Sequence, residues 1–280
     1  MSEQTVLITG TSTGIGLEIA LGCARAGWRT VATMRDPGRA ERLRDAADSA
    51  GVADLIDVRR LDVTRPTAVD SCVAEVMSAY GRLDAVVNNA GAGHVGTLEQ
   101  ESVDEVRAVM EVNFFGVLHV SHAALPHLRA SRGRLVTVSS VGGVVGQPFN
   151  EAYCAAKFAV EGFMESLAPL AATTGVRVTV VEPGAVASEF VSNIDIDAEA
   201  AIAAAGVYGP ALRAYLARTG QAFAAAQSSA DAAAVVVATL ADPAPPVRVQ
   251  TSDAARQFVG VKLADTDGGA VARLTGGWLA

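Results

Sequence analysis

The sequence predicts an α/β protein built as a doubly wound parallel sheet in a single domain. Three observations predict this class. Short β-branched runs alternate with segments of helical length through the first two thirds of the chain. Most of these runs lack polar alternation, as strands covered on both faces do. Strand–helix–strand repetition gives parallel strands joined by right-handed crossovers, with helices on both faces of the sheet.

The elements follow one another along the chain in a regular order. The expected strands are Thr5–Thr9, Thr30–Thr33, Leu55–Leu61, Ala85–Asn88, Leu135–Ser139 and Val176–Val181. The expected helices include Ile15–Ala26, Thr67–Tyr80, Val103–Arg129 and Ala152–Thr173. Each of Gly27, Gly81 and Gly175 precedes a strand, where a left-handed helix end suits glycine.

The pattern changes after about residue 185. Asp195–Gln227 is rich in alanine and contains no strand-like run, so we predict a helical flap over a ligand crevice; a surface insertion without a role is the alternative. The rest of the chain is expected to form a helix, a turn, a strand and a last helix, at Ala230–Ala241, Pro243–Pro246, Val247–Gln250 and Asp253–Leu263. We expect residues 1–280 to form one domain, with its core in 5–184 and the flap and C-terminal part in 185–280.

Composition narrows the class of protein. Half of the 280 residues are hydrophobic and 19% are charged, which is typical of a globular chain. The net charge of −8 disfavours a nucleic-acid partner. Cys23, Cys72 and Cys154 are odd in number and far apart, so we expect no disulfide framework, no metal site and a cytoplasmic location. The longest apolar stretch, around Ala232–Ala241, is too short to span a membrane.

A glycine-rich turn joins the first strand to the first helix. Its residues are Gly10, Thr11, Ser12, Thr13, Gly14, Ile15 and Gly16. Gly10 permits a sharp turn, Gly14 lets the backbone approach a pyrophosphate, and Gly16 lets the helix pack closely on the strand. The helix N-terminus offers N–H groups to phosphate. In this setting the turn predicts a Rossmann-type dinucleotide site; a tight turn without a ligand is the alternative.

The end of the second strand bears on which dinucleotide binds. Met34 is followed by Arg35, whose guanidinium can grip a ribose 2′-phosphate with two parallel donors. A strand two residues longer would instead place Asp36 on the ribose hydroxyls, as in NAD enzymes. We expect NADP(H) rather than NAD(H); a solvated loop charge is the other interpretation of Arg35.

Polar and small residues follow the third and fourth strands. Asp62, which precedes Val63, can accept a hydrogen bond from an adenine amino group or cap a helix. Asn89 can cross-link strand ends, and Ala90 and Gly91 leave room for a flat ligand. These positions are assigned to the cofactor site, with a polar turn as the alternative.

Tyr153 and Lys157 are candidate acid–base residues. They are four apart near the start of a helix and share one face. A tyrosine hydroxyl has a pKa near 10, which an adjacent ammonium lowers. A serine at the end of the fifth strand, Ser139 or Ser140, can hydrogen-bond a substrate carbonyl while the tyrosine donates its proton. Without a serine there, the spacing of Tyr153 and Lys157 is more typical of a plain surface pair.

Together these motifs resemble the short-chain dehydrogenase/reductase family. The matching motifs are Gly10…Gly14-x-Gly16, Asn88-Asn89-Ala90-Gly91, Asn113, Ser140, Tyr153-x-x-x-Lys157 and Pro183-Gly184. They occur in the family's order and spacing between about Thr5 and Phe190. The stretch from Ser139 to Gly162 resembles the 17β-hydroxysteroid and retinol dehydrogenase subgroup.

The resemblance implies roles for the matching positions. Tyr153 would be the general acid/base, and Lys157 would lower its pKa and hold the nicotinamide ribose. Ser140 would orient the carbonyl, and Asn113 would hold a water in a proton relay through Lys157. The cofactor site would also include Tyr153, Lys157, Pro183, Gly184, Val186 and Ser188, the last standing where the family commonly has threonine.

The sequence therefore predicts an NADP(H)-dependent oxidoreductase that interconverts a carbonyl and a primary or secondary alcohol. Its small-molecule substrate would be bulky and apolar, such as a steroid, a retinoid or a polyketide-like ring, because apolar residues surround the motifs. These residues are Val141, Val144, Val145, Pro148, Phe149, Phe190 and Val191, and ordinary core packing is their alternative role. His94 could contact substrate, or be a loop histidine with no role.

The resemblance also implies a homodimer or homotetramer. Three other interpretations stay open: an NAD-dependent enzyme of the same family, an epimerase that retains its nucleotide, and a catalytically silent dinucleotide sensor. A sensor needs no acid/base residue, so the presence of Ser140, Tyr153 and Lys157 argues against it.

Overall fold

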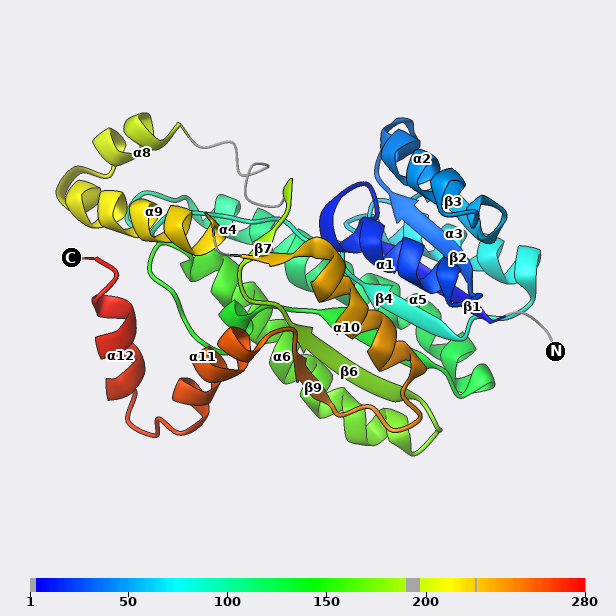
Figure 1. Ribbon diagram of the computed structural model, residues 1–280. Coiled ribbons are helices and arrows are strands. Elements are labelled where there is room, and N and C mark those ends of the chain that lie inside the picture. Colours follow the sequence, from blue (N-terminus) through cyan, green and yellow to red (C-terminus); the bar gives the residue numbers. More distant parts are fainter. Residues whose placement is uncertain (1–3, 190–196, 225, 280) are drawn as a thin grey trace.

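The computed structural model describes residues 4–189, 197–224 and 226–279. Its main sheet has seven parallel strands in the order β3-β2-β1-β4-β5-β6-β9. The strands are β1 Thr5–Thr9, β2 Arg29–Met34, β3 Ile56–Arg60, β4 Ala85–Asn88, β5 Arg134–Val138, β6 Arg177–Glu182 and β9 Arg248–Gln250 (Figure 1). The predicted parallel sheet is confirmed, and its order reverses between β1 and β4.

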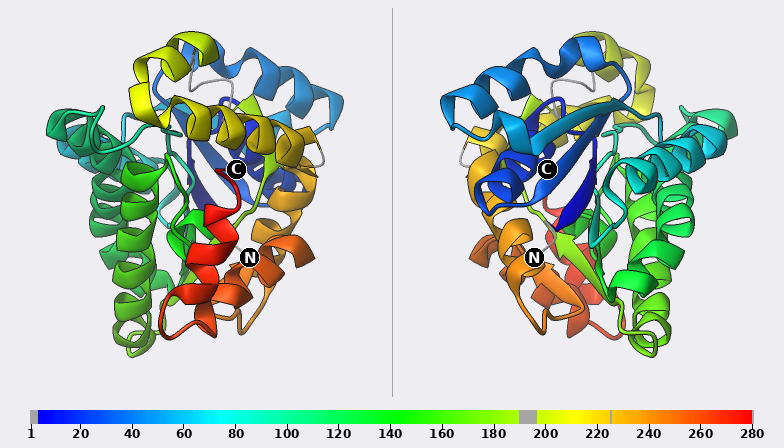
Figure 2. Two further views of the ribbon diagram at one scale, coloured as in Figure 1. Left: turned by 90° about the vertical axis from the view of Figure 1, so that its left-hand side faces the viewer. Right: turned by 90° about the vertical axis from the view of Figure 1, so that its right-hand side faces the viewer.

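Helices cover both faces of the sheet, as Figure 2 shows. One face carries α3 Pro66–Tyr80, α4 Val103–Met110, α5 Gly116–Ser131 and α6 Glu151–Ala172. The other carries α1 Gly14–Arg25, α2 Glu41–Ser49 and α10 Ser229–Ala241. Neighbouring strand residues alternate between two apolar cores, since Leu7 packs with the first set of helices and Ile8 with the second. The doubly wound prediction is therefore confirmed.

The predicted elements match the observed ones closely. Most of their ends agree within one residue. Gly27, Gly81 and Gly175 adopt left-handed φ angles of 84°, 70° and 84°, as expected before a strand. Helix α2, which buries Leu43 and Ala47, is an element that the sequence analysis did not name.

The predicted helix over 103–129 is not regular. Between α4 and α5, Glu111–Phe115 widen into a π-helical turn, a feature often found at functional sites. By length and composition alone, the whole run Val103–Ser131 would be long enough to cross a membrane. In this fold its α5 part packs against α3 and β4 and buries Val117, Val120, Ala124 and Leu128 in the core.

The C-terminal third forms the predicted flap and adds small elements. Helices α8 Ala198–Ala204 and α9 Gly209–Ala224 lie above the carboxyl end of the sheet (Figure 1). A short strand, β8 Gln227–Ser228, pairs with β7 Val186–Ala187, where no strand was expected. After α11 Asp253–Leu263 comes an unpredicted helix, α12 Gly269–Gly276. The residues that follow α12 pack against α9, so the chain end folds onto its own domain.

Candidate active site

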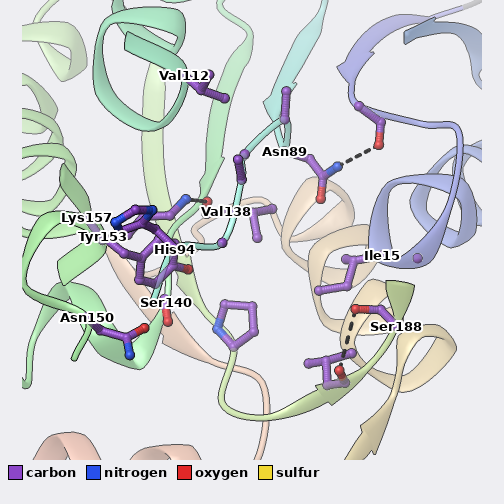
Figure 3. A pocket seen from close by; sticks show the side chains of 18 of the residues that line it. Ile15, Asn89, His94, Val112, Val138, Ser140, Asn150, Tyr153, Lys157 and Ser188 are labelled. Carbon is purple, nitrogen blue, oxygen red and sulfur yellow. Dashed lines mark hydrogen bonds between the residues drawn. The ribbon is translucent and has the colours of Figure 1, made fainter. Parts of the chain in front are cut away.

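A cavity of about 1240 Å³ lies at the carboxyl ends of the strands, where the sheet order reverses. The glycine-rich turn, the loops after β2 to β6 and helix α9 form its walls. Figure 3 shows Ile15, Asn89 and Ser188 on one side and Tyr153, Lys157 and Ser140 on the other. All but two of the predicted site residues line this cavity; the exceptions are Thr11 and Asn113.

Thr11 supports the turn instead of facing the cavity. Its side chain is fully buried. Its backbone N–H and its hydroxyl both donate to the carbonyl of Thr33, over 3.1 and 3.2 Å. The Thr11 side chain therefore holds the end of β2 to the β1–α1 turn, and the assignment of Thr11 to the cofactor site stays a prediction.

The glycine-rich turn forms a cradle that side chains would fill. Gly10 and Gly14 have φ angles of 72° and 58°, which favour glycine. A Cβ on Gly10 would lie 2.8 Å from Ala90 Cα, and one on Gly16 would lie 2.2 Å from the Gly10 carbonyl oxygen. Asn89 Nδ2 donates to the carbonyls of Thr9 and Gly10, over 2.9 and 3.0 Å. The predicted function of each glycine thus has a geometric reason.

The N-terminus of α1 receives an anion within the chain itself. The carboxylate of Glu189 accepts a hydrogen bond from the Gly14 N–H and forms an ion pair with Arg42. These contacts, with the Arg42 hydrogen bond first, hold the pKa of Glu189 below its usual range. A phosphate meets the same N–H groups at a helix N-terminus, so the residues present fit the pyrophosphate of a dinucleotide.

Two arginines line the far end of the cavity after β2. Arg35 was predicted there, and Arg39 joins it from the short helix Pro37–Ala40. Asp36 caps that short helix, with Oδ1 accepting from the Gly38 N–H over 2.9 Å. The strand ends at Met34, so the longer strand that would aim Asp36 at a ribose is not formed.

Asp62 lines the cavity and also shapes its own loop. Its Oδ1 accepts from the N–H and the hydroxyl of Thr64, over 3.0 and 2.7 Å. Burial works to raise the pKa of Asp62, but the Thr64 hydrogen bonds and the Arg35 guanidinium bring it below the usual value. Helix α3 begins with Arg65 as its N-cap, so the helix-cap interpretation of Asp62 is wrong.

Tyr153, Lys157 and Ser140 meet in the cavity wall opposite the cradle (Figure 3). Tyr153 and Lys157 occupy successive turns of α6, and Lys157 Nζ lies 5.8 Å from the centre of the tyrosine ring. Ser140, just after β5, hydrogen-bonds Tyr153, while its Oγ accepts from the Gly142 N–H over 3.0 Å. Buried Lys157 donates to the carbonyl of Val138 over 3.2 Å.

The protonation of this cluster differs from the sequence expectation. Burial raises the pKa of Tyr153 to about 12, against the opposing effect of Ser140. Burial also lowers the pKa of Lys157 to about 8, although Glu161 works to raise it. Lys157 was expected to lower the pKa of Tyr153, but burial dominates that pKa, with Lys157 Nζ 5.8 Å from the ring centre and bonded to the Val138 carbonyl. At neutral pH this arrangement holds a protonated tyrosine and a charged lysine.

Asn113 lies behind the cavity wall and not in it. The π-helical turn buries its side chain completely. Its Oδ1 accepts from the Ala92 N–H, and its Nδ2 donates to the carbonyls of Ala92 and Val109, over 3.2, 3.0 and 3.1 Å. A Cβ on Gly91 would come within 2.9 Å of Asn113 Oδ1 and 3.6 Å of Lys157 Nζ. The asparagine therefore fixes the 91–92 loop beside Lys157.

The other half of the cavity is larger and more apolar. His94 lines it, and its Nε2 lies 2.8 Å from Oε1 of the shielded Glu101, so the imidazole is held in place. Asn150 donates a hydrogen bond to the hydroxyl of Tyr215 on α9. Sequence reasoning missed several lining residues, namely Arg39, Gln147, Asn150, Tyr215, Arg218, Phe258 and Trp278. Gln147 and Asn150 had a local signal, because they are polar residues between Ser140 and Tyr153.

The set of apolar residues predicted to surround the substrate is corrected in part. Val141 lines the cavity. Val144, Val145 and Phe149 are instead buried in packing clusters, as the alternative had it. Pro148 does not line the cavity, and Phe190 and Val191 lie outside the described residues. The large apolar and aromatic side chains of the substrate half come from α9, α11 and the chain end.

Comparison with known proteins agrees with this arrangement. Residues 4–199 match the family model for short chain dehydrogenase. Retinol dehydrogenase 8 of Bos taurus is 37% identical over 95% of this chain and 87% of its own. Human 17-beta-hydroxysteroid dehydrogenase type 1 is 35% identical over 96% of this chain and 83% of its own.

Solved structures share the fold along nearly the whole chain. A short-chain dehydrogenase from Streptomyces avermitilis is 29% identical, with a TM-score of 0.77 over 98% of this chain and 99% of that one. A metagenomic short-chain oxidoreductase in complex with NADP is 26% identical, with a TM-score of 0.70 over 89% of this chain and 97% of that one. The chain belongs to the short-chain dehydrogenase/reductase family and is an oxidoreductase that acts on alcohol and carbonyl groups.

Proposed function

We propose that the protein is an NADP(H)-dependent enzyme that interconverts a carbonyl and an alcohol on a bulky apolar substrate. One observation carries the proposal. The Tyr153 hydroxyl, hydrogen-bonded to Ser140, shares a cavity with the glycine cradle at the N-terminus of α1. A proton donor and a dinucleotide cradle in one cavity support hydride transfer coupled to proton transfer.

The residues of the chain supply the position and the proton in this proposal. A bound nicotinamide dinucleotide supplies or accepts the hydride. Ser140 orients the carbonyl oxygen, and Tyr153 donates its proton to that oxygen as negative charge develops there. The ammonium of Lys157 then stabilises the phenolate that remains. Oxidation of an alcohol uses the same groups in reverse, with Tyr153 as the base.

At neutral pH Tyr153 is in the protonation state that reduction requires. Burial holds Tyr153 in its protonated form, with a pKa of about 12, so the proton donor is ready before the carbonyl substrate binds. Oxidation instead needs the phenolate, which becomes more abundant as the pH rises.

The choice of NADP(H) rests on the residues after β2. Arg35 and Arg39 both line the cavity where the ribose next to adenine is expected. Asp36, the acid that would select NAD(H), uses its carboxylate to cap the next short helix. Two guanidinium groups at this point, with the Asp36 carboxylate engaged by the Gly38 N–H, favour a 2′-phosphate.

Replacing Arg35 by alanine tests the cofactor preference. We expect Arg35→Ala to lower kcat/KM with NADPH by about 10- to 100-fold, the loss of one charge-assisted contact. The value with NADH should change little. Arg44→Ala is the matched control, because Arg44 is exposed on α2 and does not line the cavity. A wild-type preference for NADH that Arg35→Ala leaves unaltered would show that Arg35 does not bind a phosphate.

The proposed substrate class rests on the lining of the other half of the cavity. Apolar and aromatic side chains from α9, α11 and the chain end supply it, among them Leu216, Phe223, Phe258 and Trp278. Two relatives are named for bulky apolar alcohols, retinol and a hydroxysteroid, which supports the proposed class. A panel of steroids, retinoids and aromatic ketones, assayed with both cofactors, tests the proposal. We expect turnover of at least one class; turnover of none would favour the dinucleotide sensor.

The cytoplasmic location and the homodimer or homotetramer stay predictions. Light scattering on the purified protein tests the assembly. Nucleotide that remains bound through purification would favour an epimerase over a dehydrogenase.

A further inference from the structure

A buried polar network lies behind Lys157, outside the cavity. It consists of Glu161 on α6, Glu182 at the end of β6, and Arg248 and Gln250 on β9. The two glutamate side chains are 7% and 0% exposed, so both are shielded from water. Arg248 Nε lies 2.7 Å from Glu182 Oε1 and 3.6 Å from Glu161 Oε2. Gln250 Nε2 donates to Glu182 Oε2 over 3.0 Å.

The network holds two carboxyl groups but one cation of its own, the partly exposed Arg248. The carboxyl groups of Glu161 and Glu182 lie within hydrogen-bonding reach of each other. Glu161 Oε1 and Glu182 Oε1 are buried without an aligned hydrogen bond among the described residues, although Arg248 Nε forms a close ion pair with Glu182 Oε1. A carboxylate can only accept, whereas a protonated carboxyl group can also donate. One proton between the two groups therefore satisfies both oxygens.

The energetics point the same way as the geometry. Burial and the neighbouring Glu161 raise the pKa of Glu182 to about 7, against the hydrogen bond from Gln250 and the charge of Arg248. Burial also raises the pKa of Glu161, against the effects of Ser139, Arg248 and Lys157. Two carboxyl groups that share a buried site rarely ionise together.

This pair faces the catalytic residues directly. Glu161 is one helical turn beyond Lys157 on the same face of α6, and its charge acts on the lysine. A Cβ on Gly143 would meet Ser139 Oγ at 2.7 Å, Glu161 Cγ at 2.9 Å and the Lys157 carbonyl at 3.1 Å. The glycine thus leaves room for Ser139, the neighbour of Ser140, to approach Glu161. Glu182 in turn precedes Pro183, which lines the cavity.

We propose that Glu161 and Glu182 share one proton at neutral pH and that this pair, anchored by Arg248, sets the charge of Lys157 and holds α6 against the ends of β5 and β6. Glu161 and Glu182 are then positioning residues, because they act through Lys157 and do not reach the cavity. This inference rests on the proposed function only for its effect on catalysis. The shared proton is a property of the folded chain alone.

The shared proton is tested without any activity assay. The pair retains a proton that unfolded glutamates, with a pKa near 4.5, release. The free energy of unfolding should therefore fall as the pH rises from about 4.5 to about 7. We expect Glu161→Gln and Glu182→Gln each to reduce this slope in denaturant titrations at several pH values. Glu165→Gln is the control, since Glu165 contacts Arg248 from the exposed side, 2.9 Å away. If the free energy of unfolding fell equally with pH in wild type and in all three variants, the shared proton would be overturned.

The effect on Lys157 is tested by the pH dependence of kcat/KM. Wild type should lose activity above about pH 8, where Lys157 loses its proton. Glu161→Gln leaves the negative charge on the more distant Glu182, so this alkaline loss of activity (the alkaline limb of the pH profile) should move to lower pH. Glu182→Gln leaves Glu161 ionised beside Lys157, so the limb should move to higher pH. Each shift should be about half a pH unit or more, and Glu165→Gln should show none.

The two tests separate the possible failures. If the variants reduce the pH dependence of the free energy of unfolding but do not shift the alkaline decrease of kcat/KM in opposite directions, the shared proton is supported and the positioning role is overturned. Shifts in the same direction for both variants would also overturn it, because a merely structural loss lowers activity without moving the limb in opposite directions. If no substrate is turned over, the proposed function fails, and the unfolding slopes still decide the shared proton.

Discussion

Tyr153→Phe is expected to lower kcat by about 10³-fold or more, because a positioned proton donor typically contributes 10²- to 10⁴-fold and the neighbouring Ser140 hydroxyl is assigned to orient the carbonyl, not to protonate it. The change removes one oxygen atom and keeps the ring, which packs beside Lys157 on α6. The affinity for NADPH, measured by calorimetry or by quenching of fluorescence, should stay within about threefold of wild type. The glycine cradle is built from other elements, so it is unaffected.

The matched control for this change is Tyr208→Phe. Tyr208 also donates its hydroxyl to another side chain, Glu99, but on the surface of the flap and away from the cavity lining. It should retain wild-type turnover. Near-normal turnover of a good substrate by Tyr153→Phe would remove Tyr153 from the mechanism. An unfolded Tyr153→Phe protein is recognised by its circular dichroism.

The sheet and its turn were predictable because their causes are local. Strands buried on both faces need continuous apolar runs, and these appear in the sequence as short stretches of valine, leucine and isoleucine. Gly10 and Gly14 need positive φ angles, and Gly16 needs a close approach to β1, so each glycine reflects a backbone requirement. The structure meets these requirements where the sequence placed them.

The parts of the site that were missed depend on packing between distant segments. Tyr215 on α9 and Trp278 after α12 enter the cavity from segments whose positions no local pattern determines. The charge states of Tyr153 and Lys157 likewise follow from burial. The spacing of the two residues shows that they share a helix face, but not that burial outweighs their mutual attraction. The relay role expected for Asn113 stays a prediction; the structure places it near Lys157, where the π-helical turn gives it a supporting contact with Ala92.

Gly16→Ala should have the second large effect, on both cofactor binding and stability. The added Cβ would lie 2.2 Å from the Gly10 carbonyl oxygen and 2.4 Å from Asn89 Nδ2. Both atoms belong to one hydrogen bond of 3.0 Å that closes the turn, so neither can move without breaking it. Helix α1 must therefore shift away from β1. We expect about 1–3 kcal/mol less stability, the usual cost of overpacking, and at least about 100-fold weaker dinucleotide binding.

Gly162→Ala distinguishes this clash from a general effect of replacing glycine in a helix. Gly162 lies in the interior of α6, and a Cβ there has no heavy atom within 4 Å. The control should keep wild-type affinity for NADPH and gain about 0.5–1 kcal/mol in stability, because alanine loses less backbone entropy in a helix. If Gly16→Ala bound NADPH as tightly as the control, the pyrophosphate could not lie at the N-terminus of α1. Weaker binding by Gly16→Ala alone, in a protein that still unfolds cooperatively, ties the cofactor to the cradle independently of any substrate.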